Sequence, residues 1–489
     1  MANTLNLFTF CILFSLSSIA GWAQIVDDDA LQHAWDFADA QLRETLNSLR
    51  QDASRHPKVT NNVETDGDGQ WKTTGRGGWT SGFFSGCLWK MAMHTHDEFW
   101  QQNAAKWTAD LESQKYNDGD HDIGFRMLCS FGQGYHLKPN DDYKQILHTA
   151  ATTLASRFDE TIGCIKSWDW TGNYAVIIDN MMNLELLFWS AKNGGNAALY
   201  DMAVSHADKT RENHVYEDGS TWHVVDYADD GSVIKKFTQQ GYSDGSCWSR
   251  GQAWGIYGFT VAYRETGASR FLETAEHLAN YFIQHLPDDY VPYSDFNAPN
   301  IPNCEKDASA AAITCAALFE LDQFSTTDYR TSAENILQSL LTQYLAESTV
   351  YASILHRASQ WWGDDERGSI YADYYVLEAM QRYEQAKARV ATTEKPPETV
   401  QLQAAYPNPF NPTTCIAFEL PAAGIVHLDV LSATGTQVAT LLDQHMSAGP
   451  HEVYWHGMDA AGKSVASGLY LYRLHYGNQC RIKKVVLMR

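Results

Sequence analysis

The sequence predicts an all-α domain of paired helices followed by a small all-β sandwich, and three observations lead to this fold class. Between residues 29 and 389, apolar residues recur at steps of three and four, the spacing of one helix face. After residue 403, apolar and polar residues alternate, as they do in strands. The stretch between these regions, residues 391–403, contains Thr, Glu and Pro residues and predicts a linker.

The helical domain is predicted over residues 27–390 and contains about a dozen helices. In the first helix, Leu31, Ala38 and Leu42 share one apolar face. Gly-, Trp- and Asp-rich connections join the helices in pairs, which predicts an α/α toroid with its chemistry at the loops and inner helix ends. The other predicted helices span Gly82–His94, Glu98–Lys115, Ile123–His136, Tyr143–Phe158, Ala175–Lys192, Ala197–Asn213, Gln252–Thr266, Arg270–His285, Ala308–Leu321, Tyr329–Ala346 and Ala372–Ala388.

The β domain is predicted over residues 404–489. Short alternating runs, such as Ile416–Leu420, Val426–Val430 and Leu469–Leu474, are separated by Gly-containing turns. About ninety residues of short strands predict a small β-sandwich. It is an appended module with no predicted catalytic role.

The composition excludes several classes of partner. The chain has 489 residues with 59 Asp and Glu against 36 Lys and Arg, a formal charge of −23. Nucleic acids and anionic membrane surfaces need a basic footprint, so neither is an expected partner. An anionic ligand would have to be held by local basic groups. The 16 Trp and 25 Tyr residues favour stacking on sugar rings, although excess core aromatics explain them equally well.

The N-terminal residues 1–23 predict a secretory signal peptide. Leu5–Ile19 is apolar, and Gly21-Trp22-Ala23 supplies a cleavage site of small residues. No later segment is long and apolar enough to span a membrane. The Cys residues are scattered without metal-ligand spacing, which favours buried thiols, while Cys415 and Cys480 lie in one domain and could pair.

Two aspartates are the candidate acid/base residues. Asp179 lies within an apolar stretch that reads as a helix, where burial would raise its pKa and suit it to donate a proton. A buried Asp that caps a neighbouring helix is the alternative. Asp122, in Asp120-His121-Asp122, stands at a helix start, where an N-cap is the ordinary interpretation.

Other polar and aromatic residues suit a sugar acid. Arg250 offers a fork for a substrate carboxylate, with ring faces from Trp248 and Trp254 beside it. Trp79 lies in a Gly-rich loop and His223 in a Trp-His pair, each with a structural explanation of equal weight. The Asp-Gly-Asp segments lack the Gly that a calcium loop needs at its sixth position, so neither a metal nor a cofactor is expected. Without a metal or a cofactor, these residues favour acid/base chemistry on a sugar.

Several motifs together resemble glycoside hydrolase family 88, the unsaturated glucuronyl hydrolases. They occur in order between residues 29 and 389 and read GRGGWTSGFFSG, DHDIGF, VIIDNMMNLELLFWSA, WSRGQAWGIYGF, KDASAAAITCAALFEL and IYADYYVLEAM. The resemblance implies an (α/α)6 barrel. It also implies an exo-acting enzyme that hydrates the C-4/C-5 double bond of a terminal unsaturated uronate left by a polysaccharide lyase.

The resemblance implies roles for individual residues. Asp179 matches the family's general acid/base, and Asp122 matches a second catalytic-site aspartate that holds the uronate ring. The positions that match the family's substrate-binding residues are His223, Gln240, Arg250, Trp254, Trp79, Trp168 and Tyr374. The expected partners are unsaturated uronyl oligosaccharides of glycosaminoglycan or ulvan type.

The C-terminal domain resembles the sorting domain of type IX secretion. The matching residues are Tyr406–Thr414, Ala466–Tyr470 and the basic end Arg481–Arg489. This implies export to the cell surface or medium through the type IX machinery, with the periplasm as the alternative location.

Three other functions fit part of the sequence. The related family 105, the unsaturated rhamnogalacturonyl hydrolases, shares the barrel and the chemistry, but the VIIDNMMNLELL and WSRGQAW strings favour family 88. A catalytically silent carbohydrate-binding protein would not need both Asp122 and Asp179. A sugar epimerase would normally use a pair of histidines, and His223 has no evident partner in a matching motif.

Overall fold

The computed structural model describes residues 25–62, 67–363, 367–393, 399–446 and 449–488. The predicted signal peptide, residues 1–23, lies outside the described residues. The chain divides after Tyr383 into a helical unit and a β unit. In the parts that are described, no helix combines the length and the hydropathy that a membrane span requires.

Two kinds of helix alternate along the helical unit. The outer helices bury one stripe each, as α10 does with Phe271, Ala275, Leu278 and Phe282. The inner helices are buried on most sides, and every residue of α11 is buried. The outer helices are α1 (Asp28–Ser48), α3 (Glu98–Asp110), α6 (Asp141–Ala155), α8 (Ala198–His214), α10 (Ser269–Gln284) and α12 (Arg330–Gln343). The inner helices are α2 (Ser81–Thr95), α4 (Ile123–Met127), α7 (Leu184–Lys192), α9 (Ser249–Thr266), α11 (Ala308–Leu321) and α13 (Ile370–Thr393).

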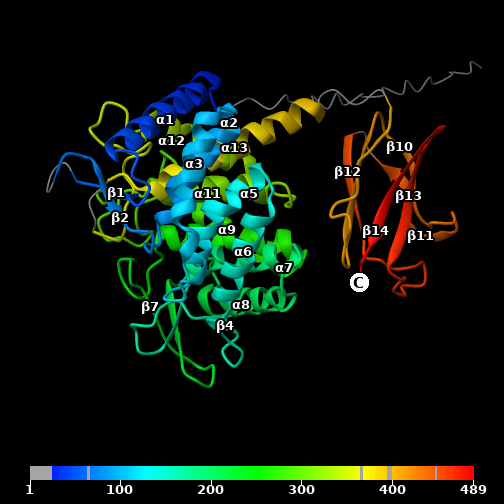
Figure 1. Ribbon diagram of the computed structural model, residues 1–489, viewed down its shortest axis with the longest axis horizontal. Helices are drawn as coiled ribbons and strands as arrows, with labels where there is room; N and C mark the ends of the chain where they lie inside the picture. The colour runs from blue at the N-terminus through cyan, green and yellow to red at the C-terminus, as the bar shows by residue number, and fades with distance from the viewer. Residues whose placement is uncertain (1–24, 63–66, 364–366, 394–398, 447–448, 489) are drawn as a thin grey trace, which may run out of the picture. The chain divides into compact units, whose positions relative to one another are not determined.

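The inner helices form a closed ring. Helix α2 packs on α4, α4 on α7, α7 on α9, and α9 on α11. Helix α13 closes the ring, because Arg382 donates to the carbonyl of Ala316 in α11 and Gln381 donates to that of Lys90 in α2. Figure 1 shows α9 and α11 within the helical unit and α1, α3 and α12 around them. Within the described residues six inner and six outer helices alternate, so the predicted (α/α)6 barrel is confirmed.

One predicted helix is wrong in its first half. The segment Ala175–Lys192 begins instead as strand β5 (Tyr174–Ile177), continues as a 3-10 turn (Ile178–Met182) and becomes helical only in α7. The β-branched residues of β5 pair with β6 (Val224–Tyr227), which pairs with β7 (Val233–Phe237). A short apolar run looks the same in a buried strand and a buried helix, so its periodicity could not separate them.

Other local elements were also not predicted. Two hairpins, β1 (His56–Thr60) with β2 (Trp71–Thr74) and β3 (Phe158–Asp159) with β4 (Cys164–Ile165), lie between helices. The predicted helix Glu98–Lys115 is α3 followed by a 3-10 turn, Glu112–Tyr116. Helix α4 continues through a π turn, Leu128–Gly132, into α5 (Gln133–Leu137).

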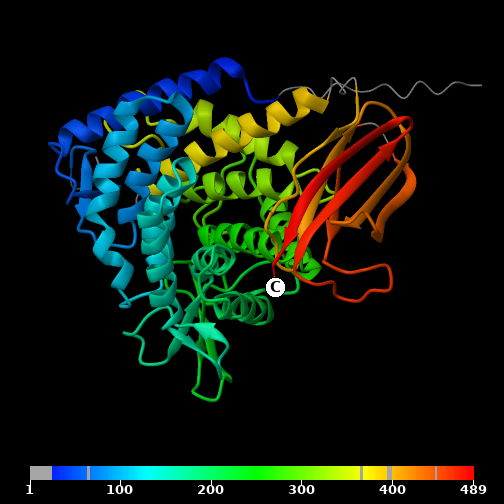
Figure 2. The same cartoon turned by 45° about the vertical axis from the view of Figure 1, so that its right-hand side comes forward.

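The β unit is a sandwich, as predicted. Its described strands form one antiparallel sheet in the order β11-β10-β13-β14 and a second in the order β12-β9-β8, and both are visible in Figure 2. Apolar side chains of both sheets, among them Phe418, Leu428, Trp455 and Tyr472, form its core. The strands are β8 (Gln401–Leu402), β9 (Thr414–Leu420), β10 (Gly424–Ser432), β11 (Gln437–Met446), β12 (Gly449–Trp455), β13 (Gly468–Tyr476) and β14 (Gln479–Leu487).

The predicted linker, residues 391–403, is too wide. Helix α13 extends to Thr393, and β8 already pairs with β9. Val400 and Leu402 alternate as strand residues do, and both are buried in the sandwich core. Cys415 and Cys480 are free thiols on strands of different sheets, and most of the other described Cys residues are buried thiols.

Candidate active site

The N-terminal ends of the inner helices meet at one end of the barrel. Asp122 directly precedes α4, Asp307 is the N-cap of α11, and Arg250 and Tyr371 lie in the first turns of α9 and α13. Asp179 lies in the 3-10 turn before α7. Helix N-termini carry partial positive charge, so this end of the barrel favours an anionic ligand.

Asp179 is a mostly buried carboxyl group, with 13% of its side-chain surface exposed, and its pKa is raised. Burial raises its pKa to about 6, the nearby negative charge of Asp122 adds to the effect, and His121 and Arg250 oppose it. Its Oδ2 atom has no hydrogen-bond partner. A carboxyl group with this pKa can donate a proton near neutral pH, which fits the role that the sequence predicts, but Asp179 lies in a 3-10 turn and not in a helix.

Asp122 does not act as a helix cap. It occupies the N-cap position of α4, but its side chain makes no capping hydrogen bond. Asp120 accepts the Asp122 backbone N–H at 2.8 Å and pairs with Arg126 at 2.7 Å. The Asp122 carboxyl group is therefore available for other contacts. Burial raises its pKa, and the charge of His121 opposes this.

His121 lies beside Asp122 and has a defined orientation. Its Nδ1 atom is 2.8 Å from Asn180 Oδ1, while the Asn180 amide donates to the carbonyl of Ile165 and to Ser167 Oγ. Nδ1 therefore carries a hydrogen, and Nε2 faces Asp122 Oδ1 at 3.5 Å. The two side chains therefore lie close to each other beside Asp179, whose pKa both of them affect.

His223 faces Asp179 from strand β6's N-terminal side. Its Nδ1 atom accepts the backbone N–H of Gln239 at 3.1 Å, so the hydrogen of the neutral ring is on Nε2. Burial, together with the charge of Arg250, lowers its pKa to about 3, so the ring stays neutral. Nε2 is 3.7 Å from Asp179 Oδ2 and has no hydrogen-bond partner. It is placed to stabilise an ionised Asp179.

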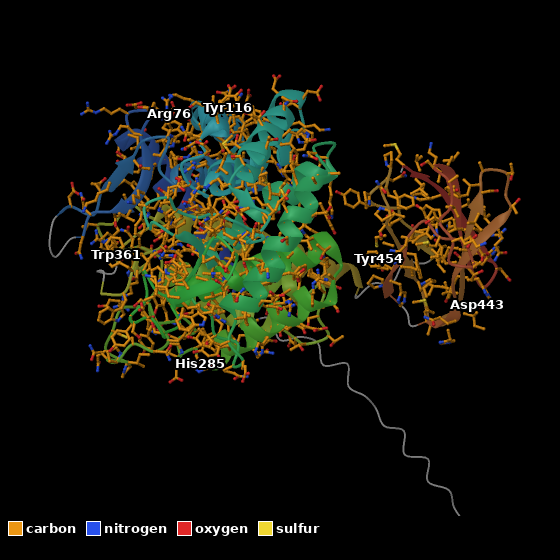
Figure 3. All side chains as sticks on the ribbon, turned by 90° about the horizontal axis from the view of Figure 1, so that it is seen from below. Arg76, Tyr116, His285, Trp361, Asp443 and Tyr454 are labelled. Atoms are coloured by element: carbon orange, nitrogen blue, oxygen red, sulfur yellow. The ribbon has the colours of Figure 1, made fainter. Side chains whose placement is uncertain are left out.

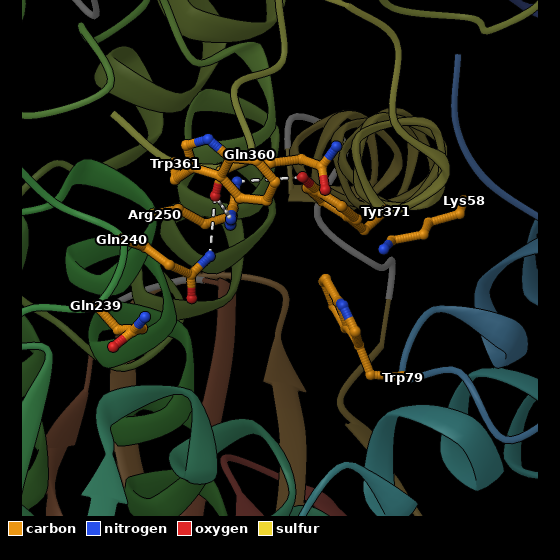
Figure 4. A pocket seen from close by; sticks show the side chains of 8 residues that line it. All are labelled: Lys58, Trp79, Gln239, Gln240, Arg250, Gln360, Trp361 and Tyr371. Atoms are coloured by element: carbon orange, nitrogen blue, oxygen red, sulfur yellow. Dashed lines mark hydrogen bonds between the residues drawn. The ribbon is translucent and has the colours of Figure 1, made fainter. Parts of the chain in front are cut away.

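A cavity of about 510 Å³ opens beside these residues, within the size range of small-molecule sites. In Figure 4, Trp79 and Lys58 lie across the cavity from Gln239 and Gln240, and Arg250 and Tyr371 lie side by side between them. Neither Asp122 nor Asp179 lines it, but Gln239 does and its backbone holds His223. The lining residues are Lys58, Trp79, Gln239, Gln240, Arg250, Gln360, Trp361 and Tyr371.

The Arg250 guanidinium is already engaged. It donates to the carbonyls of Ser359 and Gln360, lies 3.2 Å from the hydroxyl of Tyr371, and pairs with Asp307 at 3.4 Å. Its Nε atom has no hydrogen-bond partner among the described residues. The predicted fork for a substrate carboxylate therefore borders the cavity, with most of its donors used to hold neighbouring chain segments.

Of the other predicted binding residues, some line the cavity and others lie away from it. Gln240 lines the cavity and donates to the carbonyl of Gln360. Trp168 contacts the edge of His223 and stacks on Trp170 at 5.0 Å. Trp254 is fully buried, so it has no ring face to offer a ligand.

Tyr374 lies one turn deeper in α13 than the cavity. It is buried, its hydroxyl accepts from Gln133, and its ring packs on Phe83. Tyr371 occupies the cavity position instead and packs on Trp79 at 5.1 Å.

Several site residues were not predicted as such. His121, Asp307 and Tyr371 stood in recognised motifs, and their positions at helix starts were the available signal. Lys58, Gln360 and Trp361 carried no such signal, because the sequence around them has no helical periodicity. Trp361 is half exposed at the surface of the helical unit (Figure 3).

A barrel with two mostly buried carboxyl groups is typical of an enzyme that works by acid/base chemistry on a sugar-sized ligand. Comparison with known proteins narrows this class. Residues 48–395 match Glycosyl Hydrolase Family 88, and residues 409–479 match the FlgD Ig-like domain. The chain therefore belongs to glycosyl hydrolase family 88, as the sequence predicts, and this match decides against the family 105 alternative.

Individual relatives agree with the family. An unsaturated glucuronyl hydrolase of Formosa agariphila is 42% identical over 62% of this chain and 79% of that protein. That of Bacillus sp. strain GL1 is 32% identical over 70% and 94%. The solved structure of an unsaturated glucuronyl hydrolase specific for heparin has a TM-score of 0.70 at 34% identity, covering 74% of this chain and 99% of that one. The predicted enzyme class, an unsaturated glucuronyl hydrolase, is confirmed.

Proposed function

We propose that this enzyme removes a terminal Δ4,5-unsaturated uronic acid from lyase-generated oligosaccharides by hydrating the C-4/C-5 double bond. The observation that carries the proposal is the pair Asp179 and Asp122, two mostly buried carboxyl groups with raised pKa values at the inner-helix ends. Hydration of an enol ether needs a proton donor at one carbon and a base for the attacking water, which one carboxyl group can supply in turn.

The reaction begins with proton transfer. The Asp179 carboxyl group donates its proton to C-4, and the double-bond electrons form the new C–H bond. The positive charge that develops at C-5 is shared with the ring oxygen. His223 Nε2–H, at 3.7 Å from Asp179 Oδ2, stabilises the carboxylate that remains.

Water then completes the hydration. Its oxygen bonds to C-5, and its proton returns to the Asp179 carboxylate, which restores the acid. The product is a hemiketal at C-5, which opens by breaking the bond between C-5 and the ring oxygen. Opening leaves a hemiacetal at C-1, whose collapse releases the saturated sugar. Asp122, which lies 3.5 Å from His121, supplies a second carboxyl group beside the sugar ring of the substrate.

The uronate carboxylate is drawn to the same end of the barrel. The N-termini of α4, α9, α11 and α13 favour an anion there, and Arg250, which is paired with Asp307, borders the cavity. Trp79 and Tyr371 supply apolar surface for a sugar ring.

The substrate class that we propose is the glycosaminoglycan-derived disaccharide. The relatives include a chondroitin disaccharide hydrolase of Streptococcus pneumoniae, and a solved complex of a Streptococcus agalactiae variant contains dGlcA-GalNAc6S. Purified enzyme should release the saturated sugar from unsaturated disaccharides of chondroitin or heparin, detected by mass spectrometry, with ulvan disaccharides tested in parallel. Release from ulvan alone would reassign the substrate class, and release from none would refute the proposed function.

We further propose that residues 404–489 act as a type IX sorting domain and that the enzyme is exported to the cell surface or medium. Support comes from the Tyr406–Thr414 and Ala466–Tyr470 motifs, the basic residues Arg481, Lys483 and Lys484, and the separate core of the β unit. A fluorescent reporter fused to this domain should reach the surface of a bacterium with type IX machinery. Retention of the reporter in the periplasm would contradict the proposal.

A further inference from the structure

Lys58 carries a positive charge into the cavity that no described group neutralises. It extends from β1 and lines the cavity opposite Gln239 and Gln240 (Figure 4). No hydrogen bond or ion pair joins its ammonium group to the described residues. Arg250 differs, because Asp307 balances its charge at 3.4 Å. Among the described residues that line the cavity none is acidic.

The backbone around Lys58 is held in place. Strand β1 pairs with β2, and Val59 forms an antiparallel bridge with Ser369 at the start of α13. The Thr60 backbone N–H donates to the carbonyl of Gly368 at 3.0 Å. These bonds fix Lys58 next to Tyr371, so its ammonium group can reach a ligand in the cavity at low cost in backbone entropy.

The position of Lys58 assigns it to a ring other than the reacting one. The charged groups that act most strongly on the pKa of Asp179 are His121, Arg250 and Asp122, and Lys58 is not among them. The reacting uronate must lie against Asp179, so the cavity beyond Arg250 and Gln240 receives the sugar to which the uronate is linked. In a chain of charge −23, an unbalanced lysine at that position attracts an anionic substituent.

We propose that Lys58 is a specificity-determining residue that binds an anionic substituent, such as a sulfate ester, on the saturated sugar of the substrate. This inference rests on the proposed function, because it places the uronate at Asp179. The ammonium group forms a charge-assisted hydrogen bond to the sulfate oxygen, with the face of Trp79 beside the sugar ring.

The test compares substrates with and without sulfate. Lys58→Met should raise the KM for an unsaturated disaccharide with a 4-O- or 6-O-sulfate about tenfold or more. It should change the KM for the unsulfated disaccharide less than about twofold, and added salt should weaken the difference. Lys58→Arg should keep most of the preference. Lys72→Met is the matched control, because Lys72 is paired with Val59 in the same hairpin, is exposed and lies outside the cavity lining.

The possible outcomes distinguish a failure of the proposed function from a failure of the role proposed for Lys58. If the wild-type enzyme turns over neither substrate, the proposed function fails. If it turns over the unsulfated substrate but not the sulfated ones, or if Lys58→Met raises both KM values equally or changes neither, the proposed function stands and the role of Lys58 is refuted. The same selective loss in Lys72→Met would show that net charge, not position, causes it.

Discussion

The pKa of Asp179 sets the expected pH dependence of catalysis. Burial raises it to about 6, and the acid is active only when protonated. We therefore expect kcat/KM to fall as the pH rises through about 6, with a tenfold loss for each further pH unit. A pH profile with the unsulfated disaccharide measures this. A rate that stays constant from pH 5 to 8 would contradict it.

The same burial makes stability depend on pH. Because the folded pKa of Asp179, about 6, exceeds its ordinary value of 3.8, ionisation opposes folding, and stability is lost as the pH rises from about 4 through 6. Asp179→Asn cannot ionise. We expect the variant to match the wild type near pH 4 and to gain up to about 3 kcal/mol relative to it by pH 8. Unfolding midpoints at both pH values test this, and a difference independent of pH would refute it.

At the scale of elements, the contact between α9 and the 3-10 turn positions Asp179. A Cβ atom at Gly258 in α9 would lie 2.3 Å from the Cβ atom of Met181 in that turn. Gly258→Ala should therefore displace the turn, destabilise the helical unit by about 1–3 kcal/mol and lower kcat more than it raises KM. Thermal unfolding and steady-state kinetics measure both effects.

The control for this substitution is Gly245→Ala. A Cβ atom at Gly245 would meet nothing within 4 Å. We expect it to leave stability and kcat close to those of the wild type. If Gly258→Ala were equally silent, the turn would be less tightly positioned by α9 than the packing indicates.

The apolar setting of Asp179 could be predicted from the sequence, whereas the local structure that holds it could not. Asp179 was predicted to be the acid because an apolar setting for a carboxylate is costly, and that argument holds in a helix or a 3-10 turn. Strand β5, which directly precedes the turn that contains Asp179, was not predicted, because its pairing with β6 is a long-range contact that a local sequence pattern does not contain. The engagement of Arg250 by Asp307 and the choice of Tyr371 over Tyr374 likewise depend on contacts between distant segments.

Lys58 could not be predicted as a cavity residue from the sequence. It lies in a stretch between the first two helices with no periodic pattern, and only the pairing of β1 with β2 and Ser369 places it in the cavity. Its positive charge did not distinguish it either, because the chain contains 36 Lys and Arg residues.

At the scale of the whole molecule, the two units have separate cores. The β unit has its own apolar cluster, including Phe418, Leu428 and Trp455, and the described site residues all belong to the helical unit. A chain that ends at residue 398 should therefore keep kcat/KM within about twofold, since α13 remains whole. Kinetics on the purified truncated protein tests this, and loss of activity in a folded truncated protein would make the β unit part of the active site.

In the reaction that we propose, Asp179 protonates C-4 of an unsaturated uronate. The conjugated enol-ether carboxylate absorbs ultraviolet light, whereas the hydrated and opened product does not, so loss of absorbance follows the proposed step directly. The wild-type enzyme should bleach a lyase-generated disaccharide, and Asp179→Asn, folded as judged by circular dichroism, should reduce the rate at least a hundredfold. Bleaching by Asp179→Asn at a rate close to that of the wild type would contradict the account.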